Sequence, residues 1–210
     1  MGINFNSMST ASAAPTPAPV VSQGMTLDLS KNTILDVTKR NPGLRNMVLG
    51  AGWDTSRSAQ TVDLDIFAFA LNANDKLSSV SNVVYFNNKV ISGVKLNGDN
   101  LTGEGEGDDE TMDIDLAEVS PDVQSIVFAV AIYDAVNKRQ TFGMVDNSYV
   151  RLINKDAGDK ELCHFILKDD YSTDTAVIFA KLVRNGSDWD FITIGEGKQA
   201  DINGLVALFS

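Results

Sequence analysis

An acidic, glycine-rich stretch is the part of this sequence whose residue types and spacing could do chemistry. Residues 98–110 read GDNLTGEGEGDDE, with four glycines and three consecutive carboxylates at the end. The glycines permit backbone turns that point carbonyl oxygens inward. Repulsion among Asp108, Asp109 and Glu110 is costly in a folded loop unless a cation or an arginine offsets it. Calcium is bound by carboxylate, amide and carbonyl oxygens, so the stretch predicts a site for one or two Ca²⁺ ions.

Polar residues elsewhere extend this predicted site. Asp63 and Asp65 stand at i and i+2 of an extended segment, so we expect both carboxylates on one face. Asn87 and Asn88 offer amide oxygens at the end of another predicted strand. A merely solvated acidic loop without a ligand is the alternative, because isolated acidic runs are usually of that kind.

Two better-known binding motifs do not fit the stretch. Asp99 and Glu110 have the end-to-end spacing of an EF-hand loop, but Glu104 stands where that loop needs glycine and no amphipathic helices flank it. A phosphate-binding glycine loop is excluded by the spacing, by the lack of lysine and by glutamates that would repel phosphate. Any calcium site is therefore expected to be of the strand-and-loop kind.

The inventory of reactive side chains argues against catalysis. The chain has one cysteine and one histidine, Cys163 and His164, so it can build neither an intrachain disulfide nor a zinc-finger type site. They are neighbours in a predicted strand, where adjacent side chains point to opposite faces. We expect Cys163 in the core and His164 on the outer face. Without a nucleophile–base pair or a G-x-S-x-G motif, the sequence predicts no enzyme.

Charge is concentrated in one part of the 210-residue chain. The 42 residues between Lys95 and Lys138 contain 11 acidic and no basic residues, which equals the whole net charge of −11. An acidic surface disfavours nucleic acid and a polybasic membrane anchor, and no apolar run is long enough to span a bilayer. The first residues lack the basic and apolar regions of a secretory signal, so we expect a cytoplasmic protein.

Short apolar segments rich in β-branched and aromatic residues dominate the rest of the chain. They predict an all-β (mainly β) fold, a two-sheet β-sandwich with few short helical turns, one of them within 116–123. The segment 61–71 first alternates and then becomes apolar on both faces. The apolar end, 204–209, is expected to be a last strand or an assembly contact. The expected strands are 26–30, 61–71, 83–86, 125–133, 148–153, 161–167, 176–183 and 189–194.

The amino-terminal residues differ in composition from the remainder. Three of the five prolines fall within 9–19, among alanine, serine and threonine and without charge. We therefore divide the chain into an Ala/Pro-rich extension or arm, 1–24, and a β-sandwich domain, 25–210. The arm is either a disordered tail or a segment that docks on a partner. Protein partners or self-assembly are expected through residues 1–24 and the C-terminus.

The stretch 98–110 resembles the signature of the TerD family of tellurium-resistance and stress-response proteins. The similarity continues in order over 25–197, while residues 1–24 are an extension that the family lacks. Two further departures are 94–97, where many members carry a histidine, and the glycine-poor C-terminus. The similar blocks are Gly52-Trp53-Asp54, Asp63-Leu64-Asp65, Val84–Asn88, Ile126–Phe128, Ile132–Asp134, Gln140–Gly143, Tyr149–Arg151, Thr175-Ala176 and Trp189–Phe191.

This resemblance implies a calcium-binding β-sandwich without established catalytic activity. The implied ligands are the acidic Asp63, Asp65, Asp99, Asp108, Asp109 and Glu110, helped by Asn87, Asn88, Asn100 and backbone carbonyls within 102–107, for which we name Thr102, Gly105 and Gly107. The implied role is a non-catalytic module in a stress or tellurite-resistance type response. Tellurite is an oxyanion that a chain at −11 should repel, which favours a sensor or scaffold over direct sequestration. The alternative is a structural component of a large assembly, such as a phage virion or similar particle, with both termini as contacts.

Overall fold

The computed structural model describes residues 25–26, 33–55, 61–98, 100–103, 107–167 and 171–210. The predicted arm 1–24, Asp99 and Gly105 lie outside these residues. Within them no helix is long and apolar enough to cross a membrane.

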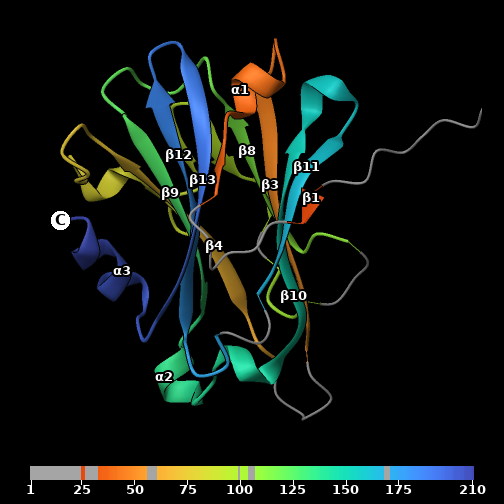
Figure 1. The fold of residues 1–210 in the computed structure, drawn as a ribbon. Helices are drawn as coiled ribbons and strands as arrows, with labels where there is room; N and C mark the ends of the chain where they lie inside the picture. The colour runs from red at the N-terminus through yellow and green to blue at the C-terminus, as the bar shows by residue number, and fades with distance from the viewer. Residues whose placement is uncertain (1–24, 27–32, 56–60, 99, 104–106, 168–170) are drawn as a thin grey trace, which may run out of the picture.

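Two β-sheets face each other and form a sandwich (Figure 1). All strand pairs are antiparallel except β1–β11. This confirms the predicted all-β sandwich. Sheet A has the order β1 (Met25–Thr26), β11 (Lys160–Ile166), β10 (Val145–Asn154), β3 (Asn46–Thr55), β8 (Glu110–Asp115), β7 (Val94–Leu96) and β6 (Val90–Ile91). Sheet B has the order β2 (Ile34–Leu35), β13 (Asp188–Lys198), β12 (Ala176–Asn185), β9 (Ser125–Ile132), β4 (Leu64–Leu71) and β5 (Val83–Val84).

Helical segments in the described residues are short. They are α1 (Val37–Arg40), α2 (Ala135–Lys138), α3 (Ile202–Leu208) and the 3-10 turns η1 (Val80–Asn82), η2 (Phe142–Met144) and η3 (Lys155–Ala157). The helical turn expected within 116–123 is not helix, because this segment forms hydrogen-bonded turns instead, with Glu118 N–H donating to Asp115 O.

The C-terminus is helix α3, not the last strand that its apolar composition suggested. Asp201 caps this helix by accepting a hydrogen bond from Gly204 N–H (2.8 Å), and such caps initiate helices. Ile202, Leu205, Val206 and Phe209 then fall on one helical face. That apolar face packs on the outer side of sheet B, where Leu205 is fully buried.

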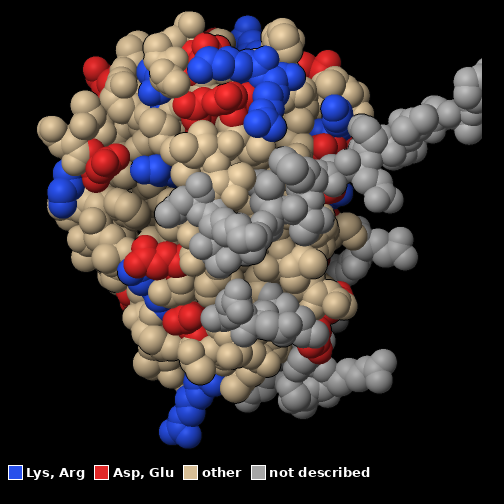
Figure 2. All heavy atoms as spheres, in the orientation of Figure 1, with Lys and Arg blue, Asp and Glu red and all other residues tan. Residues whose placement is uncertain are grey.

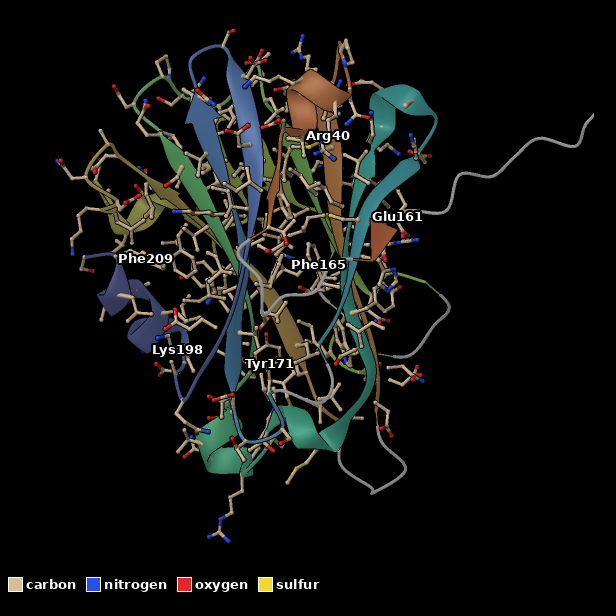
Figure 3. All side chains as sticks on the ribbon, in the orientation of Figure 1. Arg40, Glu161, Phe165, Tyr171, Lys198 and Phe209 are labelled. Carbon is tan, nitrogen blue, oxygen red and sulfur yellow. The ribbon has the colours of Figure 1, made fainter. Side chains whose placement is uncertain are left out.

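The sandwich has two hydrophobic clusters, which explain the segment that is apolar on both faces. In β4, Leu64 and Ile66 face the main core between the sheets, whereas Phe67 and Phe69 face outward under α3. The rings of Phe69 and Phe209 lie 5.0 Å apart. Figure 3 shows the contrast between Phe165, inside the sandwich, and Phe209, on the side of sheet B that α3 covers.

The single cysteine and histidine lie as predicted. Cys163 is fully buried in the main core, and burial raises the pKa of its thiol. His164 projects from the opposite face of β11, where its ring stacks on Tyr149 at 4.8 Å. The two side chains cannot act together.

Candidate metal centre

The acidic stretch ends by joining sheet A at its centre. Asp109 N–H donates to Ala51 O (2.8 Å), and β8 then pairs with β3 from Glu110 onward. On the other side of β3, β10 places Tyr149 opposite Gly52 and Arg151 opposite Gly50. Three adjacent strands therefore hold the end of the stretch.

Asp108 lies on the outer face of sheet A and is bound by an arginine. Its Oδ1 accepts from Arg151 Nε (2.8 Å) and Tyr149 OH (3.1 Å), and its Oδ2 accepts from Arg151 Nη2 (3.0 Å). Two glycines make the space: a Cβ on Gly50 would lie 2.2 Å from Asp108 Oδ2, and one on Gly52 2.5 Å from the Tyr149 ring. Either a cation or an arginine could offset the repulsion among the carboxylates, and at Asp108 the arginine does so.

The surroundings of Asp108 change the acidity of its partners. Burial, followed by the charge and the hydrogen bond of Asp108, raises the pKa of Tyr149 to about 12. The hydrogen bond to Asp108 raises the pKa of Arg151. Since both oxygens of Asp108 already accept hydrogen bonds from this bidentate arginine, Asp108 is a poor candidate for a metal ligand.

Asp109 points elsewhere, towards the loop and the backbone of β3. Its Oδ2 accepts from Trp53 N–H (2.9 Å) and its Oδ1 from Asn100 Nδ2 (2.8 Å). Burial, and then the negative charges of Asp54 and Asp108, raise the pKa of Asp109, against the effect of the Trp53 hydrogen bond. Asp109 is thus a fixed, partly desolvated carboxylate beside two others.

Asn100 organises the start of the loop. Its Oδ1 accepts from the backbone N–H groups of Thr102 (3.0 Å) and Gly103 (3.1 Å), which closes a tight turn. Gly103 has φ of 65°, and a Cβ there would lie 2.3 Å from Trp53 Nε1. Gly107, with φ of 95°, is exposed at the other end. The loop is therefore held against β3 through Trp53 and Asp109.

Glu110 faces inward, in contrast to Asp108. It is 1% exposed, and its Oε2 accepts from Ile66 N–H (2.8 Å) in β4. Strand β5 pairs with β4 only at Ala68 and Phe69, so Glu110 of sheet A binds a backbone group of sheet B beyond the end of β5. This bond links the two sheets at one corner.

The two aspartates before and within β4 belong to sheet B. Strand β4 begins at Leu64, so Asp63 precedes it, and Asp63 O accepts from Tyr133 N–H (2.8 Å). Asp65 is 3% exposed and lies on the same outer face as Phe67. The two aspartates are thus separated from Asp108, which lies on the outer face of the opposite sheet.

The two asparagines have different surroundings. Asn87 is exposed. Asn88 Nδ2 donates to Ser81 O (3.0 Å) and Val83 O (2.7 Å), and the Asn88 and Tyr85 backbones exchange two hydrogen bonds. Asn88 therefore holds the turn between β5 and β6.

The structure brings Asn100, Thr102 and Asp109 together and places Asp108, Glu110 and Asp65 in three other environments. Among the residues described, no three His, Cys, Asp or Glu side chains are close enough to hold one metal ion. Asp99, Glu104 and Glu106 are not among those residues.

Sequence reasoning missed the groups that hold these carboxylates. Arg151 and Tyr149 lie 43 and 41 positions from Asp108, so no local spacing connects them. Gly50 and Gly52 did carry a signal, because apolar residues at 47, 49, 51 and 53 alternate with them. That alternation indicates that β3 is a strand whose outer face carries no side chains at Gly50 and Gly52, which leaves room for Asp108 and Tyr149.

Comparison with known proteins agrees with this fold and sequence pattern. The model of the TerD domain matches residues 25–209. The chain is 38% identical over 188 residues to the tellurium resistance protein TerD of Serratia marcescens, covering 88% of this chain and 97% of the relative. It is 39% identical over 183 residues to general stress protein 16U of Bacillus subtilis (strain 168), covering 85% and 94%.

A solved structure shares the sandwich. The crystal structure of a homologue of the telluride resistance protein (TerD) from Streptomyces coelicolor A3(2) superposes with a TM-score of 0.64 at 27% identity, covering 77% of this chain and 94% of that one. The sequence match and the fold agree on one conclusion: this chain belongs to the TerD family.

Proposed function

We propose that this protein is a calcium-binding, non-catalytic TerD protein that acts in a stress-type response. Support for the response comes from relatives named for tellurium resistance and for general stress. Support for a non-catalytic role comes from Cys163 and His164, which project from opposite faces of β11 and form no nucleophile–base pair.

The observation that carries the calcium proposal is the state of Asp109. Its carboxylate is held by Trp53 and Asn100, is partly desolvated, and is repelled by Asp54 and Asp108. A divalent cation beside it would turn this unfavourable electrostatic environment into a favourable one. Hard oxygen donors such as these suit calcium rather than a soft metal.

The proposed ligands lie in the loop. They are Asp109 with Asp99 and the carbonyls of Thr102, Gly105 and Gly107, and Asn100 orders that turn. We propose no second ion at Asp63, Asp65 and Glu110, which are 9%, 3% and 1% exposed, because among the residues described no three acidic side chains are close enough to hold one ion. Asp108 is not proposed as a ligand either, because Arg151 already neutralises it.

The calcium-loaded protein is proposed as a sensor or scaffold rather than a tellurite trap. Tellurite carries negative charge, and it would be repelled by the 42 residues between Lys95 and Lys138, whose 11 acidic residues equal the net charge of −11. The comparisons give no support to the alternative of a particle component, so it is not proposed here.

Calcium titration of the full chain tests the proposal. We expect calorimetry to detect binding and the melting temperature to rise with calcium, because the ion binds only the folded state. At a calcium concentration one hundred times Kd, the free energy of unfolding should rise by about 2.7 kcal/mol. Asp109→Asn should weaken binding at least tenfold. The control Asp122→Asn removes an exposed charge from the same 42 residues between Lys95 and Lys138, and it should bind calcium like the unmodified chain. No heat at millimolar calcium, or equal binding by Asp109→Asn, contradicts the proposal.

A further inference from the structure

A pocket of about 400 Å³ lies on the outer face of sheet B, between α2 and the start of α3. In Figure 1 these two helices flank the lower part of that sheet. We call it the sheet B pocket. Its lining residues come from β4, the turn after β5, β9, α2 and the start of α3, and they include Asp65, Phe67, Phe86, Tyr133, Asp134 and Asp201.

The walls of the sheet B pocket are largely aromatic and aliphatic. The rings of Phe86 and Tyr133 meet edge to face with their centres 5.5 Å apart, and Phe67 also lines the pocket. Tyr133 and Val136 are 48% and 78% exposed. These surfaces suit an aliphatic chain, and exposed aromatic faces also attract cations.

The polar lining of the pocket is one-sided in charge. Asp65, Asp134 and Asp201 contribute three carboxylates from three separate elements, and the described lining residues include no lysine or arginine. Asp134 and Asp201 are positioned by neutral donors: Asn137 Nδ2 donates to Asp134 (2.6 Å) and Gly204 N–H to Asp201 (2.8 Å). These bonds fix the two carboxylates without cancelling their charge.

The protein already places a cation of its own beside this pocket. Lys138 Nζ lies 5.0 Å from the centre of the Tyr133 ring, within the range of a cation–π contact. This contact, independent of the carboxylates, shows that the Tyr133 ring accepts an ammonium group at its face. The lysine itself belongs to α2 and is not among the lining residues.

We propose that the sheet B pocket binds a linear aliphatic diamine. Its two ammonium groups would pair with carboxylates on different elements, and its methylene chain would lie against Phe67, Phe86 and Tyr133. A volume of about 400 Å³ falls in the range of small-molecule sites. A single inorganic cation would leave the aromatic walls unused, which is why the ligand is organic.

The test is titration of the full chain with diaminopentane, followed by calorimetry and by NMR shifts of Tyr133. We expect saturable binding that weakens with added salt, and weaker binding by pentylamine, which has one charge. The variant Asp134→Asn/Asp201→Asn should lose at least tenfold in affinity. It keeps the local structure, because asparagine tolerates the left-handed φ of 56° at position 134 and caps helices as well as aspartate does. The control Asp122→Asn/Asp159→Asn removes the same charge from two exposed sites.

Several results overturn the proposal. These are no binding at millimolar diaminopentane, equal binding by pentanol, or equal losses in the pocket and control variants. Displacement of diaminopentane by calcium would assign Asp65 to a metal site instead. Tighter binding of a lysine-rich peptide than of diaminopentane would make the pocket a protein-docking site. None of these outcomes affects calcium binding at Asp109, because the pocket and the loop share no residue.

Discussion

The outer faces of the two sheets meet their surroundings in different ways. On sheet A, β10 alternates buried and partly exposed residues, and polar side chains such as Arg151 and Tyr149 cover its outer face. On sheet B, all eight residues of β4 and all eight of β9 are buried, because α3 and its neighbours cover the outer face. On the outer face of sheet A, an ion pair and Tyr149 lie above two glycines, whereas the outer face of sheet B is stabilised by apolar packing against a helix.

This difference shows how strand composition reports what lies above a sheet. A strand with one solvated face alternates, while a strand covered on both faces reads as a continuous apolar run. The continuous apolar run in 64–71 therefore indicates that both faces of β4 are buried, and α3 in the C-terminal segment buries the outer one. Outside the 42 residues between Lys95 and Lys138, acidic and basic side chains are equal in number. On the face shown in Figure 2, acidic and basic side chains are intermixed.

The largest expected effect concerns the covered face. Leu205→Ala removes a fully buried side chain from under α3 and should lower the free energy of unfolding by about 2–4 kcal/mol. Chemical denaturation measures the loss. Leu208→Ala on the same helix is the control, since Leu208 is 46% exposed and should cost less than about 1 kcal/mol. Equal effects of the two variants would show that α3 does not cover the sheet through Leu205.

Most of the fold followed from the sequence, and the missing elements have physical reasons. Strands rich in β-branched residues, such as β9 and β12, were predicted because their composition matches a buried strand. Strand β3 was missed because glycine is uncommon in strands, so the alternation of Gly50 and Gly52 with apolar residues was overlooked, and β8 was missed because its acidic residues resemble a loop. The helix at the C-terminus was missed because its short apolar run fits either structure, and Asp201 decides between them.

A smaller effect is expected on the open face of sheet A. Gly50→Ala would place a methyl group 2.2 Å from Asp108 Oδ2, so Asp108 must move away from Arg151. We expect a loss of about 1–3 kcal/mol, as for an overpacked site, although alanine is normally the better strand residue. Gly98→Ala is the control, because the nearest atom to its added Cβ is 3.9 Å away. If the two variants are equally stable in urea, Asp108 does not depend on the glycine.

The candidate site was predicted only in part, and the start of β8 explains why. Consecutive carboxylates in 108–110 suggested a single cluster. Because β8 begins at Glu110, Asp108 lies before the strand, and the i, i+2 rule does not place the two on one face. Which carboxylate meets Arg151 and which meets Ile66 depends on pairing with strands distant in sequence.

The smallest effect is a change in the titration of Tyr149. Its pKa is raised from 10.0 to about 12, so the folded state holds the phenolic proton more tightly than the unfolded chain. The stability that this proton contributes is fully present below about pH 10 and is lost as the pH rises towards 12. NMR titration of the tyrosine ring, assigned with Tyr149→Phe, measures this pKa directly.

Two substitutions should move the pKa of Tyr149 in opposite directions, which separates the causes of its shift. Asp108→Asn removes the negative charge that favours the neutral phenol, so the pKa falls, but it stays above 10 because burial is the largest cause. Arg151→Met removes the positive charge that favours the phenolate, so the pKa rises. If both variants shift it in the same direction, the charges on the open face do not control Tyr149. The face would then resemble sheet B in being governed by burial alone.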